Sequence, residues 1–300
     1  MVFVIGGVNM DIAGTPEAAL RTGDSNPGRV TLSPGGVGRN IAENLCRLGR
    51  KVSLITVMGG DAYAEMIRED CRNLGIDLHC SVMDPMGRTS TYLCLNEQNG
   101  DLHAAVADMA ICEELTPEKL APFLPEINRG EFLIADANLS ERTLEWIAEN
   151  VTIPMAADPV SVAKAARLRP LLRRLAFLKP NLQEAGILAG FAPEEYGSYT
   201  RVADALHAQG VARVFLSLGG EGVWADDGRE GALLPCVPGA IVNTSGCGDA
   251  FVAAAADAYL RGMGTMDCAR RGLAAAAICA EDPAAVSPRM SEEEIELRLS

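Results

Sequence analysis

The stretch Asn243-Thr244-Ser245-Gly246-Cys247-Gly248-Asp249 runs directly into an Ala-rich segment with helical periodicity over 250–261. Small residues at 246–248 let the backbone approach a ligand closely, and their N–H groups stand at a helix N-terminus, where the helix dipole favours an anion. Asp249 falls in the first turn beside that anion, so its carboxylate could accept a proton from an alcohol that attacks a phosphate. A glycine turn before a helix, with Asp249 only complementing the dipole, is the simpler alternative.

Away from this stretch, short apolar runs alternate with segments of helical periodicity. We expect buried strands at 2–5, 52–57, 132–135, 154–157, 176–178 and 214–218. Helices are expected over 38–48, 62–74, from 116 onward, and over 141–149, 182–189, 199–209, 250–261 and 266–280. The capping-box pattern Ser291-Glu292-Glu293-Glu294 predicts a last helix. This alternation predicts an α/β fold with a mainly parallel sheet covered by helices on both faces.

Two regions, 12–34 and 76–110, interrupt the alternation. The first is polar and rich in Gly, Pro and Thr. The second contains two strand-like runs, 89–96 and 102–106, around Gln98-Asn99-Gly100-Asp101, and an Asn-Gly pair in that position is a strong hairpin signal. We expect the two regions to form a small separate sheet beside the main body. No internal repeat or long linker is evident, so residues 1–300 are expected to form a single domain.

The composition is that of an ordinary globular protein, with 300 residues of which 48% are hydrophobic and 22% charged. The net charge of −14 disfavours nucleic acid as a partner, because each phosphate contact needs a Lys or Arg. No apolar run approaches the roughly 20 residues of a membrane span, and the N-terminus lacks the basic and apolar regions of a signal peptide. Nine scattered cysteines fit a reducing compartment. We therefore expect a cytoplasmic protein with no membrane partner.

The spacing of cysteines and histidines does not favour a metal site. The number of cysteines is odd, their spacings are irregular, and no Cys-x-x-Cys pair occurs, so a disulfide framework or a zinc site is a poor fit. The three histidines, His79, His103 and His207, are dispersed along the chain. Each is expected to be a surface or packing residue.

A glycine-rich motif, Ser33-Pro34-Gly35-Gly36-Val37-Gly38-Arg39-Asn40, leads into the first predicted helix. Gly35 and Gly36 would bring backbone next to a small polar ligand, and Asn40 could hydrogen-bond that ligand. A turn with a Gly-rich helix start is the alternative. The motif holds only half of a dinucleotide fingerprint, and no Gly-Lys pair occurs in the chain, so neither a Rossmann cofactor site nor a Walker A loop is expected.

Two further motifs follow predicted strands, at the edge where open α/β sheets bind ligands. In Gly6-Gly7-Val8-Asn9-Met10-Asp11, the carboxylate of Asp11 could accept two hydroxyls of a sugar, or it could cap its own turn. The motif Leu216-Ser217-Leu218-Gly219-Gly220-Glu221-Gly222-Val223 is typical of a ligand-binding loop and equally of a β-hairpin turn.

The segment Lys179-Pro180-Asn181-Leu182-Gln183-Glu184 offers a polar pair at a predicted helix start. Asn181 and Glu184 have the spacing of an N-cap and its reciprocal carboxylate. In the functional alternative the pair faces phosphates and holds a hydrated Mg²⁺, which prefers few carboxylates and several waters.

Taken together, these motifs resemble the ribokinase-type (PfkB) carbohydrate kinase family. The resemblance covers the chain from Val4 to about Ser287. It rests on the order of Gly6-Gly7…Asp11, Gly35-Gly36-Val37-Gly38-Arg39-Asn40, Asn181-x-x-Glu184, Ser217-x-Gly219-Gly220-x-Gly222 and Gly246-Cys247-Gly248-Asp249. The resemblance implies a three-layer α/β/α sandwich with a small β-sheet lid in 12–34 and 76–110. It also implies ATP and Mg²⁺ as cofactors, and a homodimer joined through the lid.

Within the family, four stretches are similar to those of the pseudouridine kinases: Asp24-Ser25-Asn26-Pro27-Gly28, Asp108-Met109, Ala135-Asp136-Ala137-Asn138 and Asp158-Pro159-Val160-Ser161. This similarity implies transfer of the γ-phosphoryl group of ATP to the 5′-hydroxyl of pseudouridine. The alternatives are another sugar or nucleoside kinase, such as a ribokinase, a uridine or inosine kinase or a fructokinase, and an inactive kinase-like ligand sensor.

The resemblance also assigns roles to individual residues. Asp249 is the implied general base, and the implied anion hole is the backbone of Gly246, Cys247 and Gly248. The implied nucleotide side consists of Asn181 and Glu184 for phosphate and water-bound Mg²⁺, with Ser217, Gly220 and Gly222 along the nucleotide. The implied ribose site consists of Asp11, Gly36, Asn40 and Asn138, with Gly35 beside them. Asn26, in the lid, is the implied contact for the uracil ring.

The chain departs from the family pattern at two positions. The common pattern begins the last motif with Asp, where this chain has Asn243, so the charge that would favour a monovalent cation such as K⁺ near Asn243 and Ser245 is missing. The common Ala of the anion hole is Cys247, whose backbone N–H is unaffected. A thiol at a helix N-terminus is expected to have a lowered pKa and to oxidise readily.

Overall fold

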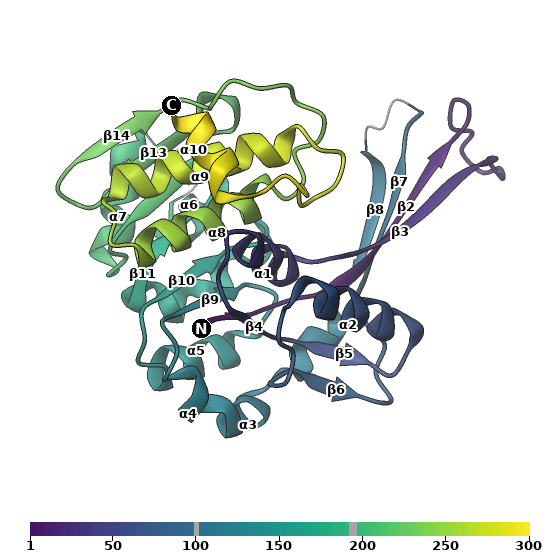
Figure 1. The fold of residues 1–300 in the computed structure, drawn as a ribbon, viewed down its shortest axis with the longest axis horizontal. Coiled ribbons are helices and arrows are strands. Elements are labelled where there is room, and N and C mark those ends of the chain that lie inside the picture. Colours follow the sequence, from purple (N-terminus) through teal and green to yellow (C-terminus); the bar gives the residue numbers. More distant parts are fainter. Residues whose placement is uncertain (99–101, 192–196) are drawn as a thin grey trace.

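An eight-stranded sheet forms the centre of the body in the computed structural model, which describes residues 1–98, 102–191 and 197–300 (Figure 1). In spatial order its strands are β14 (Gly231–Leu234), β13 (Val223–Asp226), β12 (Val214–Ser217), β11 (Leu175–Leu178), β10 (Met155–Asp158), β9 (Phe132–Asp136), β1 (Val2–Ile5) and β4 (Val52–Ile55). The strands from β12 to β4 pair in parallel, and β13 and β14 form an antiparallel edge. The predicted α/β fold with a mainly parallel sheet is confirmed.

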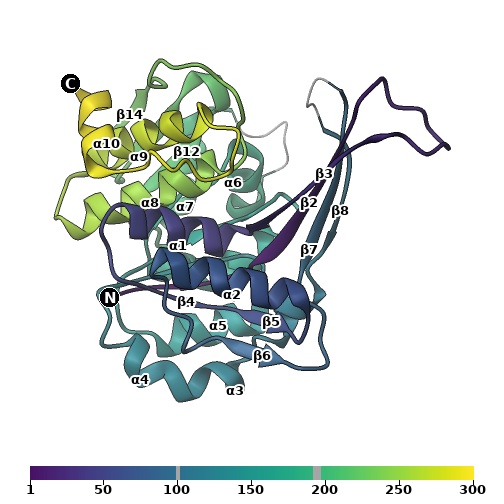
Figure 2. The ribbon, with the colours of Figure 1, turned by 45° about the vertical axis from the view of Figure 1, so that its right-hand side comes forward.

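Helices cover both faces of this sheet (Figures 1 and 2). One face carries α1 (Val37–Arg47), α2 (Ala62–Leu74), α8 (Cys247–Leu260) and α9 (Thr265–Ala280), with α10 (Glu292–Leu299) packed on α9. The other carries α3 (Pro117–Leu120), α4 (Leu124–Ile127), α5 (Glu141–Asn150), α6 (Leu182–Ala189), α7 (Tyr199–Ala208) and the 3-10 segments η1 (Ala110–Glu114), η2 (Ala121–Phe123) and η3 (Ala165–Arg174). None of the helices within the described ranges combines the length and the apolar character needed to span a bilayer.

The apolar pattern of the strands explains the layering. In β1, Val2 and Val4 belong to the core under α1 and α8, whereas Phe3 and Ile5 belong to the core under α5. Because successive strand residues point to opposite faces, a continuous apolar run of this kind is buried on both sides. The predicted strand 52–57 is broken in the structure. Val57, the last residue of the predicted strand, begins β5 (Val57–Gly59), which pairs with β6 (Val82–Asp84). At the break, the backbone N–H of Thr56 donates to the Ser81 side chain.

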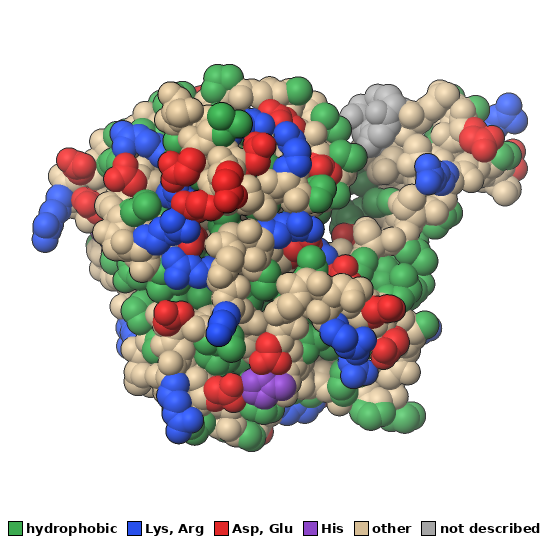
Figure 3. Space-filling view, in the orientation of Figure 1, with side chains coloured by type: hydrophobic (Ala, Val, Ile, Leu, Met, Phe, Trp, Pro, Cys, Tyr) green, Lys and Arg blue, Asp and Glu red, His purple; other side chains and the backbone are tan. Residues whose placement is uncertain are grey.

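A second, four-stranded sheet projects from the body, and we call it the lid sheet (Figures 1 to 3). Its strands, in order, are β3 (Gly28–Gly35), β2 (Asn9–Pro16), β7 (Thr91–Asn96) and β8 (Leu102–Asp108). The strands β7 and β8 pair antiparallel, as the hairpin pattern predicts, but residues 99–101 of the predicted turn lie outside the described residues. Residues 76–84 lie against the body, where Ile76 and Cys80 are buried.

Candidate active site

Charged side chains gather at the carboxyl ends of three neighbouring strands. Asp136 ends β9, Asp158 ends β10, and Lys179 follows β11. Because these strands are parallel and adjacent, their ends meet at one edge, where Asp158 pairs in register with Asp136 and its Oδ2 lies 3.6 Å from Lys179 Nζ. Both carboxylates are buried. This is the edge at which open α/β sheets bind their ligands. None of these three residues is among the site residues predicted from the sequence.

Asp249 enters the same cluster from the first turn of α8. It is 8% exposed, and Asn40 on α1 donates a hydrogen bond of 2.9 Å to its Oδ2. Burial raises the pKa of Asp249 to about 8, the negative charge of Asp158 adds to the rise, and Asn40 and Lys179 oppose it. A carboxyl group whose pKa lies this close to neutrality suits proton transfer from an alcohol.

The loop before α8 presents backbone N–H groups at the start of a helix, an arrangement that suits an anion. Gly246 has φ 78°, and a Cβ at this position would lie 1.8 Å from the Ala285 carbonyl oxygen, so only glycine fits. No side chain of the described residues caps α8; the Cys247 N–H makes a long bond of 3.4 Å to the Thr244 carbonyl oxygen, and the other first-turn N–H groups remain available to an anion. A Cβ on Gly248 would lie 2.8 Å from Lys179 Nζ. The ammonium group therefore stands beside these amides and adds a full positive charge to the helix dipole.

The neighbouring residues of this loop are held by local hydrogen bonds. A hydrogen bond from the Cys279 thiol lowers the pKa of the Cys247 thiol, with Lys179 contributing in the same direction, as expected for this position. The Asn243 side chain accepts from Ser245 N at 2.9 Å and donates to the Pro283 carbonyl oxygen at 2.9 Å. Asn243 thus organises the loop through its amide, and the monovalent cation near it stays a prediction.

The two N-terminal glycine motifs pack against each other and against the cluster. A Cβ on Gly6 would lie 2.2 Å from Asp136 Oδ2, and a Cβ on Gly7 would lie 2.6 Å from Asn138 Nδ2. Gly36 has φ 99°, and its Cβ would lie 2.6 Å from the Gly7 carbonyl oxygen. The glycines therefore bring the start of α1, with its Asn40, next to the ends of β1 and β9.

The predicted ribose contacts lie around this glycine seam. Asp11 on β2 accepts a hydrogen bond of 2.5 Å from Asn9 Nδ2. A Cβ on Gly35 would lie 2.1 Å from Asp11 Oδ2. Burial raises the pKa of Asp11. Asn138 is 4% exposed and accepts from Lys164 Nζ at 2.7 Å, a partner that the sequence did not suggest.

On the predicted nucleotide side, the first motif forms a helix capping box and the second forms a hairpin turn, as the structural alternative for each motif predicts. Asn181 and Glu184 form a capping box at the start of α6, each side chain accepting from the other backbone N–H at 2.9 Å. Ser217 donates to the Pro180 carbonyl oxygen at 3.2 Å, and η5 (Gly219–Glu221) turns the chain from β12 into β13. These contacts place the two motifs side by side, and their contact with a nucleotide stays a prediction.

Asn26 lies apart from the other predicted residues. It is in the loop joining β2 and β3, at the end of these eight-residue strands that is farthest from Asp11 (Figure 2). From Asp11 to the Pro16 end of β2 the strand runs for five residues, about 17 Å. The Asn26 side chain bonds its own loop, accepting from Arg21 N and donating to the carbonyl oxygens of Arg21 and Asp24. Within one chain the structure does not bring it to the site.

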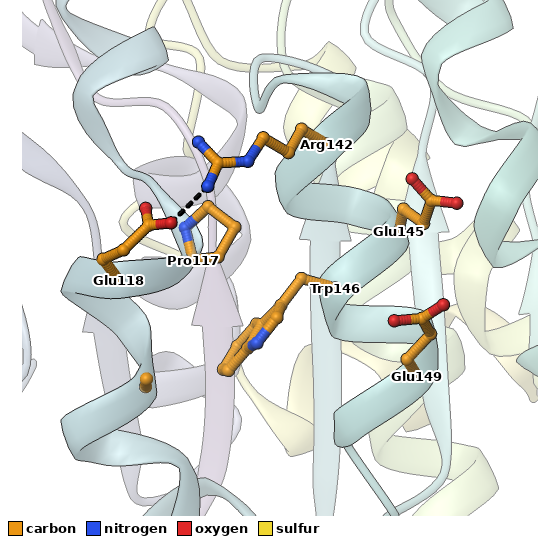
Figure 4. Close-up of a pocket in the computed structure, with 7 residues that line it drawn as sticks. Pro117, Glu118, Arg142, Glu145, Trp146 and Glu149 are labelled. Atoms are coloured by element: carbon orange, nitrogen blue, oxygen red, sulfur yellow. Dashed lines mark hydrogen bonds and ion pairs between the residues drawn. The ribbon is translucent and has the colours of Figure 1, made fainter.

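A surface hollow between α3 and α5 is distinct from this cluster (Figure 4). Trp146 lies in it between the two helices, and Arg142 pairs with Glu118 at its rim. The residues that line it are Pro117, Glu118, Ala121, Arg142, Glu145, Trp146 and Glu149. None of the predicted site residues is among them.

The electrostatic coupling of Asp249 is open to a direct test. In the ligand-free protein, the NMR signal of the Asp249 carboxyl carbon is expected to shift with a midpoint near pH 8, because burial and the charge of Asp158 raise the pKa of this group. Lys179→Met should move the midpoint to higher pH because an opposing positive charge is lost, and Asp158→Asn should move it to lower pH because a repelling charge is lost. Carbon-13 NMR of Asp-labelled protein, assigned with Asp249→Asn, measures both shifts. Equal midpoints in all three proteins would refute the coupling.

Comparison with known proteins agrees with this geometry. The pattern of the pfkB family carbohydrate kinases matches residues 1–292. The pseudouridine kinase of Escherichia coli (strain K12) is 37% identical over 265 residues, covering 87% of this chain and 84% of that protein. A solved carbohydrate kinase from Agrobacterium tumefaciens has a TM-score of 0.87 at 32% identity, over 99% of this chain and 96% of that one. The ribokinase of Thermotoga maritima shares the fold, with a TM-score of 0.86 at 23% identity over 100% and 99%. The chain therefore belongs to the PfkB family of carbohydrate kinases and has a ribokinase-like α/β fold.

Proposed function

We propose that this kinase transfers the γ-phosphoryl group of ATP to the 5′-hydroxyl of pseudouridine. The observation that carries the proposal is the buried Asp249, held by Asn40 and placed beside the amides of 246–248 and the ammonium of Lys179. A carboxylate can take the proton of an attacking alcohol, while amides and an ammonium stabilise the charge of a phosphoryl group in transit. The likeness to a pseudouridine kinase supports the choice of acceptor.

On the acceptor side, the nucleoside ribose is bound by Asp11, Asn40 and Asn138. Asn40 occupies Oδ2 of Asp249, which leaves Oδ1 to accept the proton of the 5′-hydroxyl. Lys164 fixes the Asn138 amide, since it donates to the amide oxygen and so turns the Nδ2 group away from itself. The attacking oxygen is then oriented before the proton leaves it, which reduces the entropic cost of the transfer.

On the nucleotide side, the residues present fit a hydrated Mg²⁺. Glu184 and Asp158 are both buried, and the charge of Asp158 contributes to the raised pKa of Glu184, second to burial. Two carboxylates that repel each other are stabilised by a cation between them, and Mg²⁺ takes few carboxylates and several waters. Bound Mg²⁺ would neutralise charge on the β- and γ-phosphates. Lys179 and the amides at 246–248 bind the γ-phosphoryl oxygens, and Ser217, Gly220 and Gly222 line the nucleotide.

The lid sheet is proposed to shield the site and to join two copies of the chain. Cross-strand neighbours on one face form the apolar row Leu32, Ile12, Leu93 and Val106, followed by the row Val30, Gly14, Leu95 and Ala104. Leu93 and Val106 are 51% and 68% exposed in the single chain. The opposite face carries Asp11. A second copy covering the apolar face would leave the Asp11 face directed at the nucleoside.

This arrangement predicts that the protein is a dimer in solution and that Val106→Glu makes it a monomer, because a charge on the covered apolar face cannot be desolvated cheaply. Thr31→Glu, on the opposite face of the same sheet, is the matched control and should leave the dimer intact. Sedimentation velocity measures the mass of each species. A wild-type monomer, or a Val106→Glu dimer of wild-type stability, would exclude the lid interface.

The substrate is tested by ADP release with Mg-ATP and equal concentrations of pseudouridine, uridine, ribose and fructose. Pseudouridine has a free ring N1–H that uridine lacks, and a site with a partner for this donor can discriminate strongly between the two nucleosides. We expect kcat/KM to be highest for pseudouridine. A higher value for another member of the panel would replace the acceptor and retain the chemistry. Binding of a nucleoside with no ADP release would instead favour a ligand sensor.

A further inference from the structure

Three different metal-binding groups meet beside β4, the edge strand of the main sheet, on elements that take no part in the cluster around Asp249. His79 and Cys80 lie between α2 and β6, and Glu126 lies on α4. The Cys80 Sγ is 3.1 Å from His79 Nε2, Nε2 is 2.9 Å from Glu126 Oε2, and Sγ is 3.9 Å from the same Oε2. We call these three residues the edge cluster.

The ligand atoms of the edge cluster lie within about 0.4 Å of the separations in a zinc coordination sphere. In a tetrahedral site, with Zn–N and Zn–O near 2.0 Å and Zn–S near 2.3 Å, the ligand atoms stand about 3.3–3.6 Å apart. The three separations in the edge cluster lie on either side of that range. Nitrogen, thiolate sulfur and carboxylate oxygen together suit Zn²⁺, whereas Mg²⁺ and Ca²⁺ prefer oxygen alone.

The carboxylate of Asp77 orients the histidine of the edge cluster as a zinc site requires. Asp77 Oδ2 lies 2.6 Å from His79 Nδ1, so the ring donates Nδ1–H to a carboxylate and presents Nε2 to a metal. Ser53, which pairs with Asp77 in an isolated β-bridge, is fully buried, and its hydroxyl has no hydrogen-bond partner among the described residues.

We propose that His79, Cys80 and Glu126 bind one Zn²⁺ ion. Cys80 is buried, while the side chains of His79 and Glu126 are 47% and 45% exposed, so the fourth position faces solvent and takes water or a ligand. Coordination displaces the proton on Nε2 and the proton on Sγ, and both pass to the buffer, while Nδ1–H stays bonded to Asp77. The ion ties the segment between α2 and β6 to α4.

The proposal is tested with Co²⁺ as a spectroscopic probe for Zn²⁺, added to the full chain in the presence of excess Mg²⁺. One Co²⁺ per chain should produce a thiolate-to-cobalt charge-transfer band and the visible bands of tetrahedral cobalt, and Zn²⁺ should abolish both. The bands should be lost in His79→Gln and in Cys80→Ser. Asp77→Asn should weaken binding by about 10–100-fold, because only the orientation of the ring is lost.

His103→Gln is the matched control, since His103 is an exposed histidine whose Nδ1 lies 2.5 Å from Glu97 and which makes no hydrogen bond to a cysteine within the described ranges. It should leave the spectrum unchanged. Because Cys80 is buried, its variant is also followed by thermal unfolding, and His79→Gln decides the question if Cys80→Ser does not fold. Absence of the charge-transfer band in the wild type, or its full retention in His79→Gln, would overturn the proposal.

Discussion

Asp249→Asn is expected to lower kcat by about 10²–10⁴-fold while Mg-ATP binding stays close to that of the wild type. Asparagine keeps the shape of the side chain and can still bond Asn40, but it cannot accept a proton from the 5′-hydroxyl. Single-turnover kinetics and equilibrium nucleotide binding measure the two quantities separately. A variant with wild-type kcat would remove Asp249 from the mechanism.

The same substitution is expected to make the fold more stable, so the loss of kcat cannot be attributed to a folding defect. The pKa of Asp249 is raised from 3.8 to about 8 in the folded chain, so ionising this buried carboxyl costs folding free energy increasingly as the pH rises from 4 to 8. Asp249→Asn should therefore unfold at a higher temperature than the wild type at pH 8 and at a similar temperature below pH 4. The matched control is Asp267→Asn, in the first turn of α9 but exposed, which should change neither quantity.

Lys179→Met is the second change with a large expected effect, a fall in kcat of about 10²–10³-fold, comparable to the loss of one oxyanion-hole donor. The ammonium lies beside Gly248 and 3.6 Å from Asp158, between the capping box of α6 and Asp249 on α8, the proposed proton acceptor. It is thus placed to stabilise negative charge on the phosphoryl group as that group moves between the two substrates. We expect the KM for the nucleoside to change little.

Lys179→Arg and Lys119→Met complete this experiment. Arginine keeps the charge and should recover part of the lost kcat. Lys119 is an exposed lysine paired with Glu114, so its replacement removes one positive charge without touching the site and should have no effect. If Lys179→Met instead raised the nucleoside KM and left kcat unchanged, the lysine would only hold Asp158 in position.

Much of the fold was predictable because apolar runs and helix ends are local signals. The bounds of β1, α2 and α6 agree with the prediction, and Ser291 caps α10 as its spacing indicates. The break after Ile55 was not predictable, since Thr56 leaves the strand to bond Ser81, a residue 25 positions away. The strand β13 corresponds to the β-hairpin alternative of the 216–223 motif. The edge strand β14 was not predicted, because its short, partly exposed run carries a weak pattern.

For the site, glycine motifs and caps pointed to the correct loops, but charged residues that end strands were overlooked. Asp136 and Asp158 each stand directly after a predicted buried strand, and in a parallel sheet this position leads to the ligand edge. That signal was present in the sequence. The closeness of Lys179 to Gly248 was not, because it depends on how α8 packs against the end of β11. Asn26 is the converse case. Its stretch of sequence is similar to that of the pseudouridine kinases, yet in the folded chain it lies far from the cluster around Asp249.

The hydrogen bond between Asn40 and Asp249 joins residues 209 positions apart, and β1 lies inside the sheet between β4 and β9. During synthesis, β1 therefore waits for β9 at residues 132–136, whereas Asn40 on α1 waits until residue 249 for its partner. Contacts of such long range form late, because closing a long loop costs entropy that only the complete core repays. Asp249, the proposed proton acceptor, is thus one of the last parts of the site to be synthesised. A chain truncated before α8 lacks both this carboxylate and the amides of 246–248, so we expect it to have no kinase activity.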